Sequence, residues 1–493
     1  QKETQYQSST SYSGLALLPY RKQNAVARAT YSYDGRYVVE ASFGATGSEN
    51  FAAGNRWGIF PAAGLAWNLH SEKFMVKALN IVNKFRVRAS YGITGNDNTG
   101  SDRFVYRELL TNDGNKYVGL NPGSGGGPTN NMGAIYENTF AAPNISWELE
   151  KKSNVGLDIG LFRGRIDITA DYFFNRREDI LIQRVTIPTA SGFRENPWQN
   201  FGVTTNEGFD ASITLKHSVG DWNFSARGNI TYAKNTIVEK DEIPQAYPWL
   251  EQTGTSIGVN KIYVADGLFS NNDFYINQRP DGSYSYTLKE GIPTYDPQVK
   301  PGDIKYKDLN GDGQINDMDQ TYYSGIYPNN PQIVYGFGLN IEWKGLYAGV
   351  FFQGVAKAST NLKANTNYFV PFALGKDQSS ARAEAANHWS ADNPNNFDVL
   401  YPRLHTNNYA NNTLNSTWWY RNASFLRLKN VELGYQFESN LLKKIRVENL
   451  RIYVQGANVH VWDHIKLWDP EIGNSGARYP LTSTWTFGLD ITF

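Results

Sequence analysis

The chain has 493 residues, with 47 Lys and Arg against 47 Asp and Glu, so its formal net charge is zero and nucleic acid is not an expected partner. It contains no cysteine, which excludes a disulfide framework, thiolate zinc sites and a cysteine nucleophile. Aromatic residues make up 14% of the chain, its mean hydropathy is −0.51, and no run approaches the ~18 consecutive apolar residues of a membrane-spanning helix. It begins without an initiator Met or an apolar leader, so we expect a longer precursor.

Strands are predicted along the chain from apolar and polar residues that alternate with a period of two. Between residues 37 and 46, Tyr37, Val39 and Phe43 fall on one face, whereas Glu40 and Ser42 fall on the other. The pattern recurs in 165–175, where Phe173 is the exception, in 222–232 and in the last ten residues. Thirteen strands are predicted, near 25–33, 37–46, 58–68, 85–94, 147–161, 165–177, 199–217, 221–234, 333–343, 346–356, 423–437, 449–460 and 484–493. Many reach the roughly 9–11 residues that a tilted strand needs to cross a bilayer.

The predicted connections alternate between short and long. The short ones are 34–36, 69–84, 162–164, 219–220, 344–345 and 438–448, and the long ones are 47–57, 95–146, 178–198, 235–332, 357–422 and 461–483. All long connections then lie at one end of an antiparallel sheet, as in outer-membrane barrels with short periplasmic turns and long extracellular loops. The predicted fold class is therefore all-β, a transmembrane antiparallel β-barrel. A soluble β-sandwich is the alternative, because one sheet face would pack a core and the other would meet water.

Specific strings also occur in a fixed order along the chain. They lie at 33–37, 56–61, 66–68, 72–74, 90–96, 147–148, 154–158, 171–173, 206–210, 424–430, 469–471 and 478–480, and include Tyr33-Asp34-Gly35-Arg36-Tyr37 and Asp469-Pro470-Glu471. Each string is weakly specific alone. Together and in this order they resemble the SusC/RagA-type TonB-dependent outer-membrane transporters over nearly the whole chain.

The resemblance implies a larger protein than this chain. Members of the family are about twice as long, with a TonB box, an N-terminal plug domain and roughly 22 strands. Residues 1–493 are therefore expected to be the C-terminal ~13–14 strands of one such barrel, with the plug domain absent from this chain. In the outer membrane, the long loops 235–332 and 357–422 would be extracellular and the C-terminus periplasmic.

The function that the resemblance implies is TonB-dependent active import of nutrient oligomers, glycans first and oligopeptides second. TonB would act through the missing N-terminal part, and a SusD-like surface lipoprotein would form a lid. The alternatives are a passive or structural outer-membrane barrel and a secreted glycan-binding β-sandwich protein. No nucleophile, base and orienting group stand out together, so the chain is not expected to be an enzyme.

The last strand carries a candidate assembly signal. Trp485, Phe487 and the terminal Phe493 lie on its apolar face. In the proteins that this chain resembles, an aromatic-rich last strand ending in Phe is recognised by the barrel-assembly machinery. The other interpretation is an edge strand that simply ends in Phe.

Residues 308–319 match the spacing of a twelve-residue calcium loop. The six oxygen ligands would come from Asp308, Asn310, Asp312, Gln314 through its backbone carbonyl, Asn316 and Asp319. Gly313 stands where such loops turn sharply, and calcium would brace a long exposed loop. Asp at the last position reaches less far than the usual Glu. The alternative is an acidic turn without a metal, because Asn-Gly-Asp-Gly is also a strong turn signal.

Cargo-contacting residues cannot be assigned one by one from the sequence, but the long loops carry many aromatic and amide side chains. These are Trp249, Tyr263, Phe274, Tyr275, Tyr284, Tyr286, Asn361, Asn365, Asn367, Tyr368, Phe369, Trp418, Trp419 and Tyr420. Rings next to amides suit neutral glycans, which stack on rings and hydrogen-bond to amides. For any single residue, packing inside the loops or a place in an interfacial girdle is the simpler interpretation.

Overall fold

The computed structural model describes residues 2–5, 20–100, 103–117, 133–191, 196–364, 366–375, 377, 380–437, 442, 447–473 and 476–493, with backbone alone for 2–5, 109–117, 133–139, 189 and 366. Contacts divide the chain into two compact units, which we describe separately. Unit 1 comprises Gln1–Gly164, Ile168–Phe209 and Asn235–Ile243, and unit 2 comprises Arg165–Asp167, Asp210–Lys234 and Pro244–Phe493.

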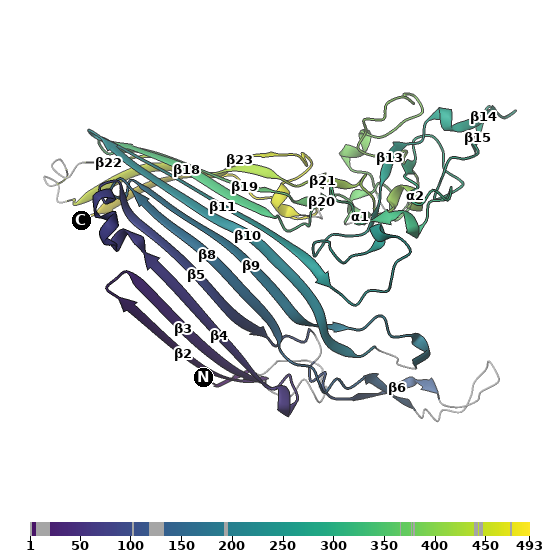
Figure 1. Ribbon diagram of the computed structural model, residues 1–493. Helices are drawn as coiled ribbons and strands as arrows, with labels where there is room; N and C mark the ends of the chain where they lie inside the picture. Colours follow the sequence, from purple (N-terminus) through teal and green to yellow (C-terminus); the bar gives the residue numbers. More distant parts are fainter. Residues whose placement is uncertain are drawn as a thin grey trace. The chain divides into compact units, whose positions relative to one another are not determined.

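One antiparallel sheet of 14 strands dominates the structure (Figure 1). Its strands, in sheet order, are β1 (Lys2–Gln5), β2 (Tyr20–Tyr33), β3 (Tyr37–Ser48), β4 (Trp57–Asn68), β5 (Val82–Asn96), β8 (Glu148–Leu161), β9 (Ile166–Gln183), β10 (Trp198–Val219), β11 (Trp222–Glu239), β18 (Ile333–Trp343), β19 (Leu346–Ala356), β22 (Phe425–Gln436), β23 (Asn449–Asp463) and β24 (Thr484–Thr492). Each of the thirteen predicted strands corresponds to one of them. β1 was not predicted, and β2 starts five residues before the predicted strand.

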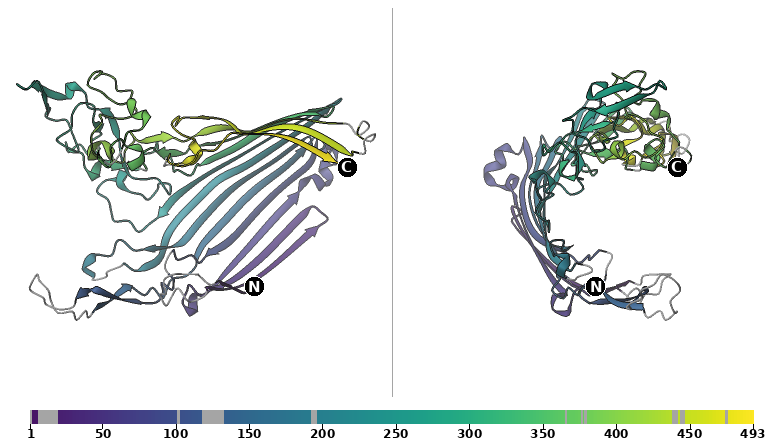
Figure 2. Two further views of the ribbon diagram at one scale, coloured as in Figure 1. Left: turned by 180° about the vertical axis from the view of Figure 1, so that it is seen from behind. Right: turned by 90° about the vertical axis from the view of Figure 1, so that its right-hand side faces the viewer.

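Each strand of this sheet pairs with the next strand of the sheet along the chain. In unit 1, β2–β5 run side by side in both views of Figure 2. In unit 2, β18 and β19 pair without a register shift from Ile333↔Ala356 to Trp343↔Leu346. The two residues between them, Lys344 and Gly345, have φ of 47° and 87°, as expected for a tight hairpin turn whose twist matches that of the strands.

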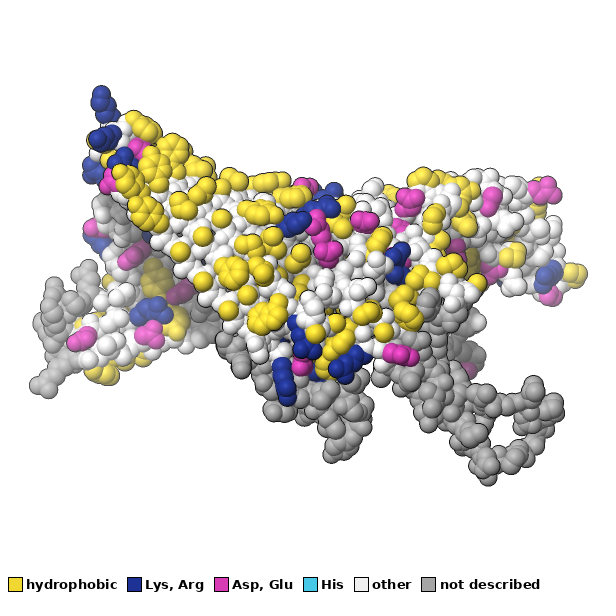
Figure 3. Space-filling model, turned by 60° about the horizontal axis from the view of Figure 1, so that its bottom comes forward, with side chains coloured by type: hydrophobic (Ala, Val, Ile, Leu, Met, Phe, Trp, Pro, Cys, Tyr) yellow, Lys and Arg dark blue, Asp and Glu magenta, His cyan; other side chains and the backbone are white. Residues whose placement is uncertain are grey.

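The predicted alternation divides the two faces of the sheet. Residues of the predicted apolar face are exposed, for example Val39 at 47%, Ile59 at 61% and Leu65 at 59%. Figure 3 shows hydrophobic side chains spread over the strands, with most charged side chains toward the margins. Among the described residues, the other sheets are two-stranded and none is large enough to cover this face. So much exposed apolar surface contradicts a water-soluble sandwich and fits a lipid-facing surface.

The connections contain secondary structure of their own, beyond the thirteen predicted strands. Their strands are β6 (Leu109–Tyr117), β7 (Gly133–Thr139), β12 (Ile262–Tyr263), β13 (Ala265–Leu268), β14 (Phe274–Gln278), β15 (Tyr284–Leu288), β16 (Ile304–Tyr306), β17 (Gln320–Thr321), β20 (Ser359–Asn361) and β21 (Tyr420–Asn422), and the α-helices are α1 (Thr366–Phe369) and α2 (Ala410–Thr413). Short 3-10 helices are η1 (Ala53–Asn55), η2 (Leu69–Ser71), η3 (Lys73–Ala78), η4 (Thr189–Ser191), η5 (Pro248–Leu250), η6 (Asn271–Asp273), η7 (Asp317–Asp319), η8 (Ala383–Ala386) and η10 (Pro470–Ile472).

The buried cores lie in these connections. In unit 2, fifteen buried residues of 263–465 form the largest cluster, and two of them, Ile304 and Leu362, are fully buried. In unit 1, a smaller cluster gathers around Phe51, Ile145 and Trp147. The sheet has its apolar side chains outward, so its loops carry the hydrophobic cores.

Candidate functional site

The two longest connections of unit 2 fold together into one body, which we call the loop assembly (residues 244–332 and 357–424). Hydrogen bonds join the two segments directly: Tyr263 N donates to Asn415 O, and Thr417 N donates to Tyr263 O. Phe369, Tyr401 and Trp419 pack at ring-centroid distances of 5.2–6.2 Å from one another in its core. The two segments therefore share one packed core.

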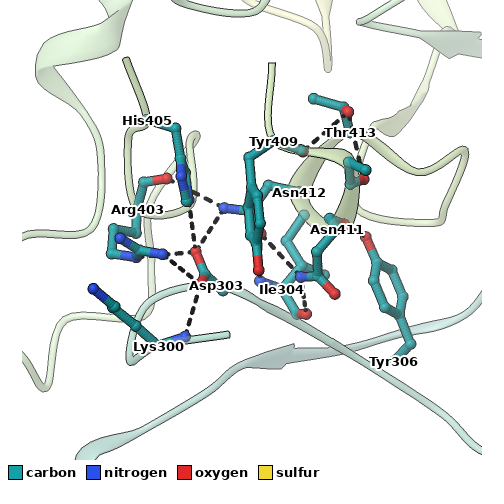
Figure 4. A network of polar contacts seen from close by, with 11 residues as sticks. Lys300, Asp303, Ile304, Tyr306, Arg403, His405, Tyr409, Asn411, Asn412 and Thr413 are labelled. Atoms are coloured by element: carbon teal, nitrogen blue, oxygen red, sulfur yellow. Dashed lines mark hydrogen bonds and ion pairs between the residues drawn. The ribbon is translucent and has the colours of Figure 1, made fainter. Parts of the chain in front are cut away.

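A buried carboxylate ties the two segments of the loop assembly (Figure 4). Asp303 is fully buried and comes from the first segment. The second segment supplies Arg403, which contacts both carboxylate oxygens at 3.0 and 2.7 Å, His405 at 3.0 Å and Asn412 at 2.8 Å. The backbone N–H of Lys300 adds a bond of 2.8 Å. Burial opposes ionisation of Asp303, but these donors outweigh it and hold the pKa of the carboxyl below its ordinary value.

Neighbouring polar groups extend this network. The Asn411 side chain donates to Ile304 O at 2.9 Å, and the Asn412 side chain accepts from Ile304 N at 3.0 Å. Tyr306 Oη donates to Asn411 O, and burial raises the pKa of this tyrosine. The network is thus a structural latch in which most polar groups bond to one another, although Asn411 Oδ1 is buried without a hydrogen-bond partner among the described residues. No local sequence pattern marks the network, because its members are separated by about a hundred residues.

The predicted calcium ligands lie in one compact turn of the loop assembly. Asp308 accepts from the N–H groups of Gly311 and Gly313 at 2.7 and 2.8 Å, and both glycines have positive φ. Asp312 accepts from Gln314 N at 2.8 Å and from the side chain of Asn310 at 3.0 Å. Oxygen atoms of the kind that calcium prefers are therefore gathered on this turn.

The closing residue of the predicted calcium loop has another role. Asp319 is fully buried, and its two oxygens accept from Leu309 N and Asn316 N, each at 2.8 Å. Asn316 caps η7 by accepting from Met318 N, while the Gln314 side chain is exposed. In the part of the chain that the structure describes, no three His, Asp or Glu side chains are arranged to hold a metal ion.

The aromatic and amide residues of the loops are buried, half-buried or exposed. The half-buried ones are Trp249, Tyr286, Asn361, Trp418 and Tyr420. Tyr263, Phe274, Phe369 and Trp419 are buried and pack the loop cores. The exposed group includes Tyr275 at 59%, Tyr284 at 53% and Tyr368 at 40%, together with Asn367. Asn365 lies outside the described residues. The exposed residues are the most accessible to a cargo or a partner.

The polar face of the sheet carries ion pairs and two hollows. In unit 1, Arg88 bridges Asp158 at 3.3 Å and Asp171 at 2.7 Å. A hollow of about 400 Å³ there is lined by residues that include Glu40, Lys152 and Phe173, the exception to the alternation. In unit 2, a hollow of about 520 Å³ is lined by residues that include Asn223, Ser225, Asn340, Tyr347, Glu432 and Arg451. Such a face can hydrogen-bond to water, a polar solute or a polypeptide.

Several of the strings that carry the family resemblance meet in space. Glu72 accepts from Tyr37 Oη at 2.7 Å and from Trp67 Nε1 at 3.0 Å. Trp147 Nε1 donates to the backbone oxygen of residue 56 at 3.1 Å. Arg427, only 2% exposed, pairs with the acidic residues of the 469–471 string at 2.6 and 2.7 Å. Glu72 and the 469–471 string thus join connections to strands, whereas Trp147 joins the connection before β8 to the connection before β4.

The aromatic residues of the predicted assembly signal lie at the end of the sheet. Trp485 and Phe487 belong to β24, at 54% and 83% exposure, and Phe493 follows the strand at 82%. β24 pairs with β23 from Asn449↔Thr492 to Ala457↔Thr484.

Long antiparallel strands, an apolar face that is exposed, a polar opposite face and long ordered connections define the architecture of an outer-membrane β-barrel. Among the described residues, no helix has both the length and the apolar character to span a membrane.

Comparison with known proteins narrows this class. No model of a known protein family matches the sequence. The TonB-dependent receptor P3 of Formosa agariphila is 27% identical over 493 residues, covering 94% of this chain and 45% of the receptor. The TonB-dependent receptor SusC of Bacteroides thetaiotaomicron is 27% identical over 474 residues, covering 94% of this chain and 43% of SusC. The structure of the RagAB peptide transporter matches 98% of this chain and 50% of the transporter chain, with a TM-score of 0.70 and 23% identity.

These matches confirm the resemblance to SusC/RagA-type TonB-dependent receptors and the all-β fold class. The relatives are receptors and a transporter, in agreement with the prediction that this chain is not an enzyme. The chain spans less than half the length of the curated relatives that it matches. The strand number of the complete barrel and the absence of a plug stay predictions.

Proposed function

We propose that this chain is the C-terminal barrel part of a TonB-dependent importer that carries nutrient oligomers across the outer membrane. The observation that carries the proposal is the similarity to SusC and other TonB-dependent receptors along nearly the whole chain. The exposed apolar face of the sheet supports a place in the membrane. Energy from TonB would act through the part of the protein that precedes these residues.

A SusD-like surface lipoprotein is the proposed partner, docking on the loop assembly. The long connections lie at one end of the strands, which would be the extracellular end, with the C-terminus periplasmic. The β14–β15 hairpin supports the docking role, since it exposes Tyr275, Ile276 and Tyr284 at 59%, 40% and 53%. Exposed aromatic residues on an ordered scaffold are frequent anchors of protein interfaces.

Glycan oligomers are the first proposed cargo and oligopeptides the second. Exposed Tyr284, Tyr368 and Asn367 on the loops provide ring faces and an amide, which suit neutral sugars. The named transporter with the same fold, RagAB, carries peptides, which keeps oligopeptides as the second choice.

Calcium at residues 308–319 is a further part of the proposal. Asp308, Asn310, Asp312 and Asn316 would supply side-chain oxygens and Gln314 its carbonyl. Asp319 would contribute only after exchanging its bonds to Leu309 N and Asn316 N. The proposed role is to brace the loop assembly.

The terminal aromatic residues are proposed to guide assembly. Trp485, Phe487 and Phe493 are strongly exposed on the last strand of the sheet or directly after it, where a partner protein can reach them. The barrel-assembly machinery is the proposed partner.

The test is purification of the native protein from outer membranes in mild detergent, followed by intact-mass measurement and peptide mapping. An importer would co-purify with an N-terminal plug-bearing segment, on the same chain or as a fragment, and with a surface lipoprotein. Binding of the complex to glycan and oligopeptide libraries would then identify the cargo. A barrel that purifies without plug or lipoprotein would support the passive alternative, and a protein extracted by water alone would refute a membrane barrel.

A further inference from the structure

The connection between β4 and β5 exposes more apolar surface than a turn requires. It contains η2 and η3, whereas β10 and β11, or β18 and β19, are joined by two residues at the same end of the strands. Within it, Phe74 is 66% exposed, Val76 61% and Ile81 55%. Apolar side chains grouped this way on an exposed segment mark a contact surface.

Hydrogen bonds fix this segment to the apolar face of the sheet. Glu72, 8% exposed, accepts from Tyr37 Oη at 2.7 Å, from Trp67 Nε1 at 3.0 Å and from Arg36 at 3.4 Å. Tyr37 and Trp67 are register partners on the apolar face and stack with centroids 6.3 Å apart. The segment that follows Glu72 therefore begins at the end of the apolar face and continues it.

Basic side chains accompany the apolar ones. Lys73, Lys77 and Lys84 are exposed, and within the described part of the chain none of them forms an ion pair. At a membrane–water interface, Tyr and Trp rings lie at headgroup level and basic side chains contact lipid phosphates. This segment has the same composition, since Tyr and Trp end the apolar face and are followed by apolar and basic residues.

We propose that residues 69–84 form an interfacial anchor, which buries Phe74, Val76 and Ile81 among phospholipid headgroups and places Lys73 and Lys77 against anionic phosphates. The binding partner of this segment is a lipid surface, because the segment continues the apolar face of the sheet, which itself requires lipid. The proposal rests on the membrane location in the proposed function. Glu72 acts as a positioning residue that holds the anchor at the rim of the barrel.

The experiment uses the absence of cysteine in these 493 residues. Phe74→Cys, labelled with an environment-sensitive fluorophore, is examined in the full-length protein reconstituted in nanodiscs of phosphatidylethanolamine and phosphatidylglycerol. Spin-labelled lipids carry the quencher either at the headgroup or deep in the acyl chain. Leu65→Cys on the apolar face of β4 serves as the lipid-facing control, and Tyr284→Cys on the β14–β15 hairpin as the aqueous control.

The expected result is a blue-shifted Phe74 label that is quenched by the headgroup quencher, a Leu65 label quenched by the acyl-chain quencher, and an unquenched Tyr284 label. A quenched Leu65 label beside an unquenched Phe74 label would overturn the anchor and leave the membrane barrel standing. If neither label is quenched, the membrane barrel itself fails, and the anchor with it.

Two further variants separate positioning from charge. Glu72→Ala should release the segment, so that the Phe74 label loses its quenching while the Leu65 label keeps it. The pair Lys73→Gln and Lys77→Gln should reduce quenching of the Phe74 label to the level seen in nanodiscs of phosphatidylcholine alone. Quenching that does not change with anionic lipid or with these lysines would overturn the proposed phosphate contacts.

Discussion

Replacing Asp303 by Ala should open the loop assembly locally without unfolding the sheet. The carboxylate is fully buried and its partners Arg403, His405 and Asn412 would lose their common acceptor. Removing one member of a buried ion pair costs about 3–5 kcal/mol. Because Arg403 keeps 25% of its side chain exposed and can regain water, we expect the lower end, about 3 kcal/mol. Asp303→Asn keeps one acceptor oxygen and should cost about 2 kcal/mol.

Hydrogen–deuterium exchange of the full-length protein in detergent measures this opening. The amide of Arg403, bonded to Gly302 O at 2.7 Å, should exchange about a hundredfold faster in Asp303→Ala, the ratio that corresponds to ~3 kcal/mol. Asp266→Asn is the matched control, since Asp266 is 49% exposed and pairs loosely with Lys307 at 3.7 Å, and it should change exchange little. Unchanged exchange at Arg403, or an equal effect of the control, would refute the latch.

Four other outcomes are expected. The folded state lowers the pKa of Asp303, so the latch stabilises the loop assembly above the unfolded-state pKa of about 4, and this stabilisation is lost as pH falls through the folded-state pKa. Hydrogen–deuterium exchange of the loop assembly, corrected for intrinsic rates, should therefore rise only below about pH 4. Gly434→Ala should cost about 1–3 kcal/mol in thermal unfolding in detergent, because its Cβ would clash with the Tyr347 side chain, whereas the Cβ of Gly54→Ala meets nothing within 4 Å and this variant should not be destabilised. Calcium should raise the unfolding temperature of the native protein but not of Asp308→Asn, and equal shifts would reject the site. Deleting Phe493 should lower the folded, membrane-inserted fraction in cells, and normal insertion would contradict the assembly signal.

The strands could be predicted because each carries its own pattern. Val39 and Leu65 are apolar because their face needs no protein partner, while Glu40 and Ser42 face the polar side. This difference between the two faces produces the period of two from which the thirteen strands were predicted. Turn residues such as Lys344-Gly345 then mark the hairpins. Strand ends were less accurate, as at β2, because pairing extends past the alternating stretch.

The loop assembly could not be predicted for the opposite reason. Asp303 and Arg403 are 100 residues apart, and neither stands in a periodic pattern. Tyr275 and Phe274 are adjacent aromatic residues on one strand, yet one is exposed and the other buried. Tertiary packing decides which of the two side chains lies in the hydrophobic core, and this packing depends on residues that are distant in the sequence.

The β20–β21 ladder has a consequence for how the sheet is built. Ser359 pairs with Asn422 directly beyond the ends of β19 and β22, and Ala423 N donates to Ala358 O at 2.9 Å. The two ends of this long connection are therefore held together by backbone hydrogen bonds. Closing a loop costs entropy that grows by about 0.6 kcal/mol for each doubling of its length. Once the β20–β21 ladder and the loop core have formed, β19 and β22 can pair at the low entropic cost of a short hairpin. Insertions between β20 and β21 can therefore lengthen the connection without changing the register between β19 and β22.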